Sequence, residues 1–271
     1  MKAQSLDLMH AGADVLSERQ SEIAELVRAT GFAGIDELAE RFSVSTQTIR
    51  KDVNGLCDKG LLRRVHGGVQ LAGVGNLEYK MRKVLRYSAK QQIAAAVAEA
   101  IPNGSSLSIS IGTTPEAVVS ALLNHTNLKI QTNNLNIAMI ANAAGTFDVS
   151  IPGGLIRRGD GDIIGPSAVA FFESYKADFG IFGVAAVDAD GGLLDFHEEE
   201  VAARQAILRN CRTSFLVLDH MKFERNAHVR GGHIAEVNNV FCDKEPPPAI
   251  ADKLLKSGAT ITVCGKEGAR P

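Results

Sequence analysis

The sequence has little cysteine, no excess of charge of either sign and no long hydrophobic run. Its four cysteines, Cys57, Cys211, Cys242 and Cys264, are far apart and form no two-residue spacing. They indicate neither a metal site nor a disulfide framework, and they fit a reducing compartment. The 29 Lys and Arg residues nearly balance 31 Asp and Glu residues, for a net charge of -2, so the chain does not coat polyanions non-specifically. Any contact with nucleic acid must come from a local basic patch.

Segments that direct a protein to or across a membrane are also missing. Met1–Asp14 contains one lysine, two aspartates and no continuous apolar core, so it lacks the parts of a secretory signal. The longest stretch without a charged residue, Ile130–Phe147, is interrupted by glutamine, threonine and asparagine side chains that a bilayer core would reject. We therefore expect a soluble, cytoplasmic protein with no membrane contact.

The 271 residues, 45% of them hydrophobic and 22% charged, are enough for one large or two smaller globular domains. Ser17–Leu71 has the pattern of three short helices and a hairpin, whereas the remainder alternates apolar strands with helical segments. We predict an N-terminal extension (1–16) whose order the sequence leaves open, a first domain (17–72), a linker (73–89), a second domain (90–265) and a tail (266–271).

The second domain is built from repeated strand, loop and helix units. Ser106–Ile111 alternates apolar residues with serines and precedes Gly112-Thr-Thr-Pro115, where a proline marks a helix start. Similar units begin with Leu128–Thr132, Phe179–Val184 and Thr213–Asp219. Strands that alternate with helices predict an α/β fold with a mostly parallel sheet covered on both faces.

Residues 35–56 have the pattern of a helix-turn-helix motif. Two helical stretches, Ile35–Phe42 and Thr46–Leu56, flank a short turn. Ala39 is small where the two helices would touch, Val44 is an apolar plug for the turn, and Ile49 would be buried. The alternative is a three-helix packing or dimerisation module whose arginines are ordinary surface charge.

The second helix of this motif carries the residues that we expect to read DNA. Ser45 caps it, so that its N-terminal half is exposed where a recognition helix meets base edges and phosphates. A strand over Leu61–Val65 and a tight turn at His66-Gly-Gly68 predict a wing that rests on the DNA backbone. Five basic and two acidic residues from Ser45 to Gly68 leave a local balance of +3. The predicted DNA-binding residues are Ser45, Thr46, Gln47, Thr48, Arg50, Lys51, Arg63, Arg64 and His66.

Two loops in the second domain are candidates for binding a phosphorylated ligand. Gly112-Thr113-Thr114 offers main-chain N–H groups, two hydroxyls and the positive end of a helix, although a capped helix is the ordinary alternative. Thr132-Asn133-Asn134 also joins a strand to a helix, with turn formation as its alternative. Both loops would meet at the carboxyl edge of one parallel sheet, where open α/β folds bind ligands.

The segments Ser43–Asn54 and Arg64-Val-His-Gly-Gly68 resemble the signature of the DeoR family of bacterial transcriptional repressors. The likeness extends from Ser17 to about Val263. Within the family, Ile101–Ser105, Ile111–Ala117, Thr132–Asn136 and Asp178–Ile181 are most similar to the branch that controls glycerol 3-phosphate metabolism. The resemblance implies a winged helix-turn-helix domain followed by a sensor domain similar to ribose-5-phosphate isomerase.

The same resemblance implies a function and a set of effector-binding residues. It implies a repressor that binds double-stranded operator DNA as a homo-oligomer, dimer or tetramer, and leaves it on binding glycerol 3-phosphate, without a cofactor or metal. The residues that fall on the family's sensor motifs are Gly112, Thr113, Thr114, Thr132, Asn133, Asn134, Gly154, Asp188, Glu200 and Lys222.

Two alternatives stay open at this point. One is a regulator of another carbohydrate operon that senses a different phosphorylated sugar. The other is a sugar-phosphate isomerase or deaminase. No lysine-glycine-glycine segment resembles the isomerase active site, and the acidic cluster Glu198–Glu200 has no obvious paired base for enediol chemistry. We therefore favour a sensor over an enzyme.

Overall fold

The structure, a computed structural model, describes residues 16–30, 32–65, 67–71 and 79–265, and it consists of two compact units that divide after Tyr87. The predicted tail and all but Leu16 of the predicted N-terminal extension lie outside the described residues. In the described part of the chain, no helix is both long enough and apolar enough to span a bilayer.

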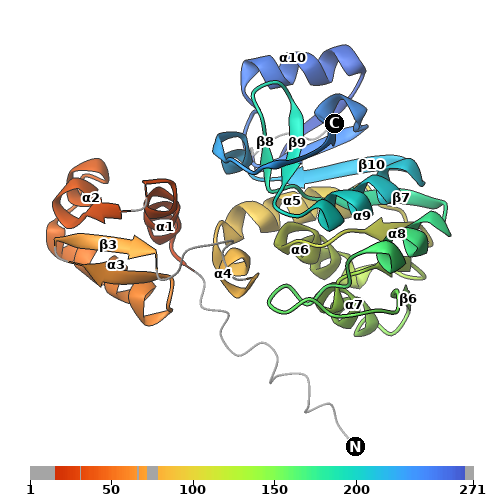
Figure 1. Cartoon of the computed structure of the whole chain (residues 1–271), viewed down its shortest axis with the longest axis horizontal. Coiled ribbons are helices and arrows are strands. Elements are labelled where there is room, and N and C mark those ends of the chain that lie inside the picture. The colour runs from red at the N-terminus through yellow and green to blue at the C-terminus, as the bar shows by residue number, and fades with distance from the viewer. Residues whose placement is uncertain (1–15, 31, 66, 72–78, 266–271) are drawn as a thin grey trace, which may run out of the picture. The chain divides into compact units, whose positions relative to one another are not determined.

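The first unit is a winged helix-turn-helix (Figure 1). Helices α2 and α3 form the motif, and α1 packs on α3. Strands β2 and β3 form the predicted wing, and β1 pairs with β3 to give an antiparallel sheet in the order β1-β3-β2. The elements are α1 (Glu18–Thr30), β1 (Phe32–Gly34), α2 (Ile35–Arg41), α3 (Thr46–Asp58), β2 (Leu62–Val65), β3 (Gly68–Leu71) and α4 (Tyr79–Val84).

The core of this unit explains the helix-turn-helix geometry. Ile49, Val53 and Leu56 recur along one face of α3 and are at most 2% exposed. Ala39 is buried where α2 packs on α3, and Val44 lies against the same core from the turn. These residues therefore occupy the positions that the sequence pattern predicted for them.

The second unit is built on a parallel sheet of seven strands in the order β13-β12-β10-β7-β4-β5-β6. All six pairings in this sheet of the described chain are parallel, which confirms the predicted α/β architecture. Its strands are β4 (Ser106–Ile109), β5 (Lys129–Thr132), β6 (Asp148–Ser150), β7 (Ala177–Phe182), β10 (Cys211–Leu218), β12 (Asn239–Cys242) and β13 (Thr260–Val263).

Helices cover both faces of this sheet. Successive strand residues alternate between two buried clusters: Ile181 belongs to one cluster and Phe182 to the other. The first cluster includes side chains from α5, α6 and α7, and the second includes side chains from α8, α9 and α10. The helices are α5 (Tyr87–Glu99), α6 (Thr113–Ala121), α7 (Leu135–Asn142), α8 (Pro166–Glu173), α9 (Glu198–Arg209) and α10 (Pro248–Ser257).

The chain order of the strands reverses between β4 and β7. From β4 the chain proceeds outward through β5 to β6, and it then returns to β7 on the other side of β4. In open α/β sheets, this is the point where the connections leave in opposite directions and open a crevice at the carboxyl ends. The Gly112–Thr114 loop follows β4 and therefore lies at this point.

A small antiparallel sheet in the order β11-β9-β8 was not expected from the sequence. Its strands, β8 (Ala186–Val187), β9 (Gly192–Asp195) and β11 (Val229–His233), are short and contain several glycines. Arg204 of α9, 1% exposed, donates to Asp195 Oδ2 from Nε (3.1 Å) and Nη2 (3.0 Å) and to the Gly231 carbonyl from Nη1 (2.6 Å). This arginine therefore fastens two strands of the small sheet to α9.

Candidate functional site

The exposed start of α3 is the first candidate site. Ser45 is its N-cap: its Oγ accepts a hydrogen bond from the Thr48 main-chain N–H (3.2 Å) and lies 2.9 Å from Thr48 Oγ1. Gln47, Arg50 and Lys51 are exposed, whereas Thr46 and Thr48 are half-buried. The cap thus fixes where α3 begins and leaves three long polar side chains facing solvent.

The wing brings two further arginines toward this helix. Arg64 of β2 donates a hydrogen bond to Asn54 of α3, while Arg63 donates to Gln70 of β3 (2.9 Å). Arg64 therefore lies beside α3, and Arg63 is held within the wing. A shallow groove between α3 and the wing is lined by Ile35, Asp36, Arg50, Val53, Asn54, Arg64, Val65, Gly67 and Gly68. His66, also predicted to bind DNA, lies outside the described residues.

Two residues of this surface, Arg19 and Asn54, were missed by the sequence analysis. Arg19 of α1 donates from Nε to Asp52 Oδ2 of α3 (2.6 Å), and Asp52 is 8% exposed. A second groove beside α3 is lined by Arg19, Gln47, Thr48, Arg50, Lys51, Asp52 and Asn54. The Arg19–Asp52 hydrogen bond joins residues 33 positions apart, and the Arg64–Asn54 hydrogen bond joins residues 10 positions apart. No local sequence pattern predicts such contacts.

The Gly112–Thr114 loop is a tight turn at the start of α6. Gly112 precedes α6 with a φ of +135°, a conformation that favours glycine, and it provides no side-chain cap. A Cβ there would lie 3.1 Å from Pro115 Cδ, because the proline ring packs against the turn. Thr113 and Thr114 form the first turn of α6, where main-chain N–H groups and the positive end of the helix attract a phosphate.

The neighbouring Thr132–Asn134 loop is buried and has structural partners. Asn134 caps α7: its Oδ1 accepts from the N–H groups of Asn136 (2.9 Å) and Ile137 (3.1 Å). Thr132 Oγ1 accepts from the Asn134 N–H (3.2 Å). Asn133 donates from Nδ2 to the Ile163 carbonyl (2.8 Å), but its buried Oδ1 has no hydrogen-bond partner among the described residues. Asn133 Oδ1 is therefore an open acceptor at this strand end, as is Gln131 Oε1 within β5.

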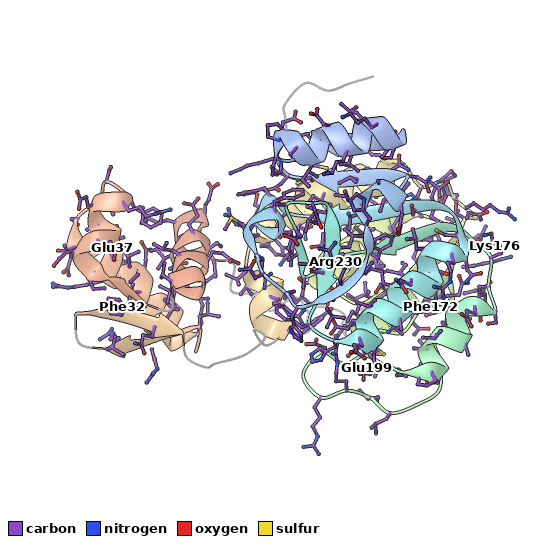
Figure 2. The ribbon with its side chains drawn as sticks, turned by 45° about the horizontal axis from the view of Figure 1, so that its top comes forward. Phe32, Glu37, Phe172, Lys176, Glu199 and Arg230 are labelled. Carbon is purple, nitrogen blue, oxygen red and sulfur yellow. The ribbon has the colours of Figure 1, made fainter. Side chains whose placement is uncertain are left out.

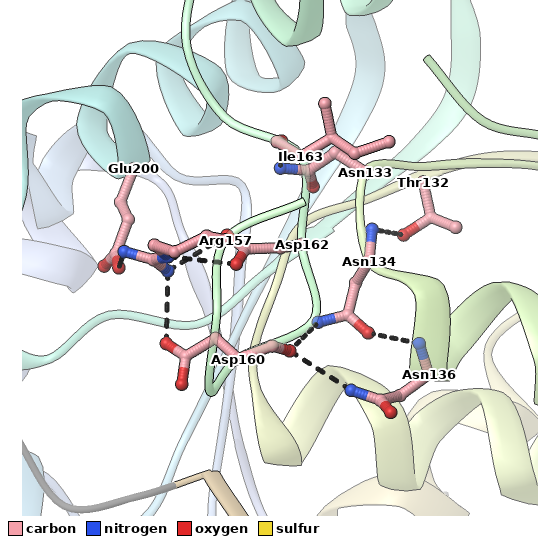
Figure 3. Close-up of polar contacts among 9 residues, drawn as sticks. All are labelled: Thr132, Asn133, Asn134, Asn136, Arg157, Asp160, Asp162, Ile163 and Glu200. Carbon is pink, nitrogen blue, oxygen red and sulfur yellow. Dashed lines mark hydrogen bonds and ion pairs between the residues drawn. The ribbon is translucent and has the colours of Figure 1, made fainter. Parts of the chain in front are cut away.

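An arginine joins the β6–α8 connection to α9 (Figure 3). Arg157 donates to both carboxylate oxygens of Asp162 (3.0 and 2.9 Å), and its guanidinium also contacts Asp160 (3.1 Å) and Glu200 of α9 (2.6 Å). Burial raises the pKa of Asp162 and of Glu200 despite this positive charge. Glu200, predicted to bind an effector, thus has Arg157 as its partner in this structure.

The remaining predicted effector residues belong to three other segments of the chain. Gly154 has a φ of +149°, a conformation that favours glycine. A Cβ there would lie 2.9 Å from the Ile163 side chain and 3.0 Å from that of Ser167, so the backbone packs closely against both. Asp188, in the turn before β9, is exposed and pairs with Arg230 of β11 (3.2 Å). Arg230 is labelled in Figure 2. Lys222 follows β10 and is half-buried. Its charge opposes the rise in the pKa of Asp195 that burial causes.

A histidine–aspartate pair at the same edge of the sheet was also missed. His220, directly after β10, donates from its main-chain N–H to Asp243 Oδ1 (2.7 Å), and its Nδ1 lies 2.7 Å from Oδ2 of that carboxylate. Burial alone would raise the pKa of Asp243, but these hydrogen bonds lower it. The pair forms because β10 and β12 are parallel neighbours, which the sequence does not reveal. Among the described residues, no group of three or more His, Cys, Asp or Glu side chains could hold a metal ion.

Comparison with known proteins assigns both units. A model of the DeoR-like helix-turn-helix domain matches residues 19–73, and a model of the DeoR C terminal sensor domain matches residues 85–244. The glycerol-3-phosphate regulon repressor of Escherichia coli (strain K12) is 44% identical over 92% of this chain and 99% of that protein. The HTH-type transcriptional repressor CsqR of the same strain is 40% identical over 90% of this chain and 94% of that protein.

Solved structures are less similar. Ribose 5-phosphate isomerase A from Neisseria gonorrhoeae matches 52% of this chain and 54% of its own with a TM-score of 0.37 and 11% identity. The isomerase from Methanocaldococcus jannaschii matches 51% of this chain and 54% of its own with a TM-score of 0.38 and 12% identity. Likenesses of this size carry no argument about activity.

Proposed function

Because the chain belongs to the DeoR family of transcriptional regulators, we propose that it represses genes of glycerol and glycerol 3-phosphate metabolism and that glycerol 3-phosphate releases it from operator DNA. Like these relatives, which are repressors, it is a DNA-binding repressor and not an enzyme. The observation that carries the specific assignment is the 44% identity, which spans both units and 99% of the Escherichia coli repressor.

The DNA contacts follow from the chemistry of α3 and the wing. Gln47 and Arg50 have the donors and acceptors that read base edges in the major groove, and Lys51 is a cation for a phosphate. Ser45 sets the start of the helix, and Arg64 is held next to Asn54. The proposed DNA-binding residues are Ser45, Thr46, Gln47, Thr48, Arg50, Lys51, Arg63, Arg64 and His66.

The effector site lies at the carboxyl edge of the seven-stranded sheet. The turn Gly112–Thr114 at the point where strand order reverses would hold the phosphate through main-chain N–H groups. Asn133 Oδ1, buried without a partner among the described residues, is an acceptor suited to a ligand hydroxyl. Thr132 and Asn134 shape this edge. Gly154, Asp188, Glu200 and Lys222 are proposed on the family motif alone.

Release follows from linkage between the two ligands. Glycerol 3-phosphate weakens DNA binding only if it prefers a conformation or subunit arrangement that binds DNA poorly. The loss of DNA affinity cannot exceed the difference between the effector's affinities for the two states. An effector that binds both states equally tightly does not change DNA binding. We further propose a cytoplasmic homo-oligomer, since paired reading heads match palindromic half-sites. Its domains follow the predicted boundaries, 17–72 and 90–265, with 73–89 as linker.

A pair of alanine variants tests the recognition helix. Arg50→Ala and Lys51→Ala should each weaken binding to a fragment from upstream of glycerol-use genes, by about 1–3 kcal/mol where a base-edge contact is lost. Lys256→Ala, an exposed lysine on α10, is the matched control and should bind normally. Anisotropy titrations at fixed salt measure all three. Unchanged binding by both α3 variants would refute the proposed reading surface.

The alternative effector is a different phosphorylated sugar. The chain is nearly as similar to the repressor CsqR, at 40% identity over 90% of its length, as to the glycerol-3-phosphate regulon repressor. The difference between the two assignments lies in the pocket. A thermal-shift panel of phosphorylated sugars and glycerol 3-phosphate separates them, since a ligand at 100 times its Kd adds about 2.7 kcal/mol of stability. A larger shift with another sugar phosphate would replace the proposed inducer and keep the repressor.

A further inference from the structure

An arginine from outside the helix-turn-helix motif reaches α3. Arg19 lies in the first turn of α1, and its Nε donates to Asp52 Oδ2 of α3 at 2.6 Å. A capping box fixes where α1 begins: Ser17 Oγ accepts from the Gln20 N–H (3.1 Å), and Gln20 Oε1 accepts from the Ser17 N–H (3.1 Å). The backbone that carries Arg19 is therefore fixed at the start of its helix.

The first turn of α1 meets α3 at a second position as well. Gly55 follows Asp52 by three residues, so the two lie on the same face of α3. A Cβ on Gly55 would lie 3.1 Å from Gln20 Nε2. The contact between Arg19 and Asp52 is thus part of helix packing and does not depend on one extended side chain alone.

This ion pair leaves most of the Arg19 guanidinium unused. Asp52 is 8% exposed, and among the described residues Arg19 is its one side-chain partner. The Arg19 side chain is 36% exposed, and its Nη1 and Nη2 have no partner in the described part of the chain. Each of these nitrogens carries two N–H groups. Four donors are therefore available to a further acceptor.

The available donors belong to a basic groove beside α3. Three cations and one carboxylate give this groove a net charge of +2, and its lining residues are Arg19, Gln47, Thr48, Arg50, Lys51, Asp52 and Asn54. Arg50 and Lys51 are exposed, and neither has an ion pair or a hydrogen bond within the described residues. Asp52 is the one acid in the lining, and Arg19 neutralises it. The groove therefore suits an anion.

A phosphate of the DNA backbone fits both the donors and their place. A guanidinium presents its N–H groups as a planar fork that matches two phosphate oxygens. The major groove is about 12 Å wide, and an α-helix with its side chains is about 10–12 Å across. A helix in the groove therefore fills it, so a side chain that arrives from a neighbouring helix meets the phosphate edge and not the bases.

We propose that Arg19 binds a DNA phosphate and that Asp52 holds the Arg19 guanidinium in position for this contact. The contact comes from α1, in addition to those of α3 and the wing, and it rests on the proposed function in assigning α3 to the major groove. A phosphate contact carries no sequence information, but it fixes the orientation of the protein on the duplex.

The salt dependence of DNA binding tests the contact. Anisotropy titrations of the full-length protein use a duplex of arbitrary sequence and the fragment from upstream of glycerol-use genes, at about 50–200 mM salt. Arg19→Ala should weaken binding to both by about tenfold at low salt. The slope of log K against log salt should become shallower by about one, as the loss of one phosphate contact requires. Arg209→Ala, which removes an exposed arginine of α9 from an ion pair with Glu173, is the matched control and should keep both values.

Asp52→Asn separates this role from a purely structural ion pair. The asparagine removes a negative charge beside the DNA but keeps an oxygen that can accept from Arg19 Nε. It should therefore bind both duplexes at least as tightly as the unmodified chain, with the same slope. A pair that only joined α1 to α3 would instead make Asp52→Asn and Arg19→Ala weaken binding alike, which would overturn the proposal.

The double variant Arg19→Ala/Asp52→Asn keeps the test valid if the unpaired Asp52 carboxylate unfolds the single Arg19→Ala variant. It contains no unpaired carboxylate at this position, and it should show the same shallower slope. An unchanged slope in the double variant would overturn the proposal.

The outcome is separable from that of the proposed function. A phosphate contact contributes to the binding of any duplex, so the slope on the arbitrary duplex does not depend on the operator or the effector. A shallower Arg19→Ala slope without any preference for the glycerol-gene fragment would support this contact and contradict the proposed function. Specific binding that glycerol 3-phosphate reverses, together with an unchanged Arg19→Ala slope, would do the opposite.

Discussion

Asn134 and Glu200 each have partners within the protein itself. Asn134 caps α7 with its side-chain oxygen, and Glu200 pairs with Arg157. Asparagines after a strand and glutamates at a helix start are common for structural reasons as well as functional ones. The same residue type can therefore have a structural or a ligand-binding role, and its partners in the folded structure are needed to tell the two roles apart. By that criterion, the Gly112 turn and Asn133 Oδ1 are the parts of the edge most suited to a ligand.

Gly55 gives a prediction at the residue scale. It lies inside α3, which continues to Asp58. A Cβ there would meet only the flexible Gln20 side-chain amide, at 3.1 Å. Gly55→Ala should therefore raise the free energy of unfolding by about 0.5–1 kcal/mol, as urea denaturation would measure. A loss of stability would show that Gln20 cannot move aside.

Asp178 gives a prediction about pH. Hydrogen bonds from the Ser106 main-chain N–H (3.0 Å) and Oγ (2.7 Å) lower the pKa of this carboxyl, with a smaller contribution from Arg212. A folded pKa below the unfolded value stabilises the protein above the unfolded pKa of about 3.9. That stability is lost as the pH falls through the folded pKa. Below about pH 5, Asp178→Asn should therefore lose stability with falling pH less steeply than the unmodified chain.

The measurement for Asp178 is urea unfolding at a series of pH values from 7 downward. Asp252→Asn, an exposed aspartate on α10, is the control and should follow the unmodified curve. If Asp178→Asn follows that curve too, the two hydrogen bonds from Ser106 do not stabilise the folded chain.

At the scale of elements, periodicity predicted what depends on local pattern. The apolar spacing in α3 located the buried Ile49, and alternation located β4 within Ser106–Ile111. The three-residue β1 is too short to alternate visibly, and the small sheet β11-β9-β8 depends on Arg204, which contacts residues 9 and 27 positions away. Pairing across such distances leaves no local signal, which is why these elements could not be predicted.

The wing depends on one glycine. A Cβ on Gly68 would lie 2.3 Å from the Ala33 carbonyl and 2.6 Å from the Phe32 ring, because β1 pairs with β3 there. Gly68→Ala should displace the wing from β1 and destabilise the first unit by about 1–3 kcal/mol, as expected for overpacking. The control is Gly153→Ala, because a Cβ on Gly153 would have no atom within 4 Å. Gly60 is less suitable because its φ of +69° would strain any side chain. Equal stability of the two variants would contradict the close β1–β3 approach.

The Arg157 cluster gives a prediction for the connection between β6 and α8. Arg157→Leu would leave the fully buried Asp162 carboxylate without its cation, so the free energy of unfolding should fall by about 3–5 kcal/mol at pH 7. The loss should shrink as the pH falls, because a carboxyl with a raised pKa takes up its proton at a higher pH than an ordinary one. Arg209→Leu, whose half-exposed pair with Glu173 contributes about 0–1 kcal/mol, is the control. Equal effects of the two changes in urea titrations would show that the cluster adds nothing.

At the scale of the whole molecule, the net charge of -2 and the local balance of +3 from Ser45 to Gly68 both indicate that positive charge is concentrated near α3 and the wing. We therefore expect DNA binding to be confined to one local surface, and its affinity should fall steeply with salt, with a slope set by the number of phosphate contacts. The division into two units and the parallel sheet were predictable from where the sequence pattern changes. The point at which the strand order reverses was not predictable, because it depends on β7 pairing with β4 after the chain has moved away to β6.

The most direct test of a repressor released by glycerol 3-phosphate is fluorescence anisotropy of the protein on DNA from upstream of glycerol-use genes. Binding is measured at one fixed salt concentration, with glycerol 3-phosphate, glycerol or inorganic phosphate added. The account predicts specific binding that glycerol 3-phosphate alone reverses. Specific binding that is indifferent to glycerol 3-phosphate, or no specific binding to any such fragment, would contradict it.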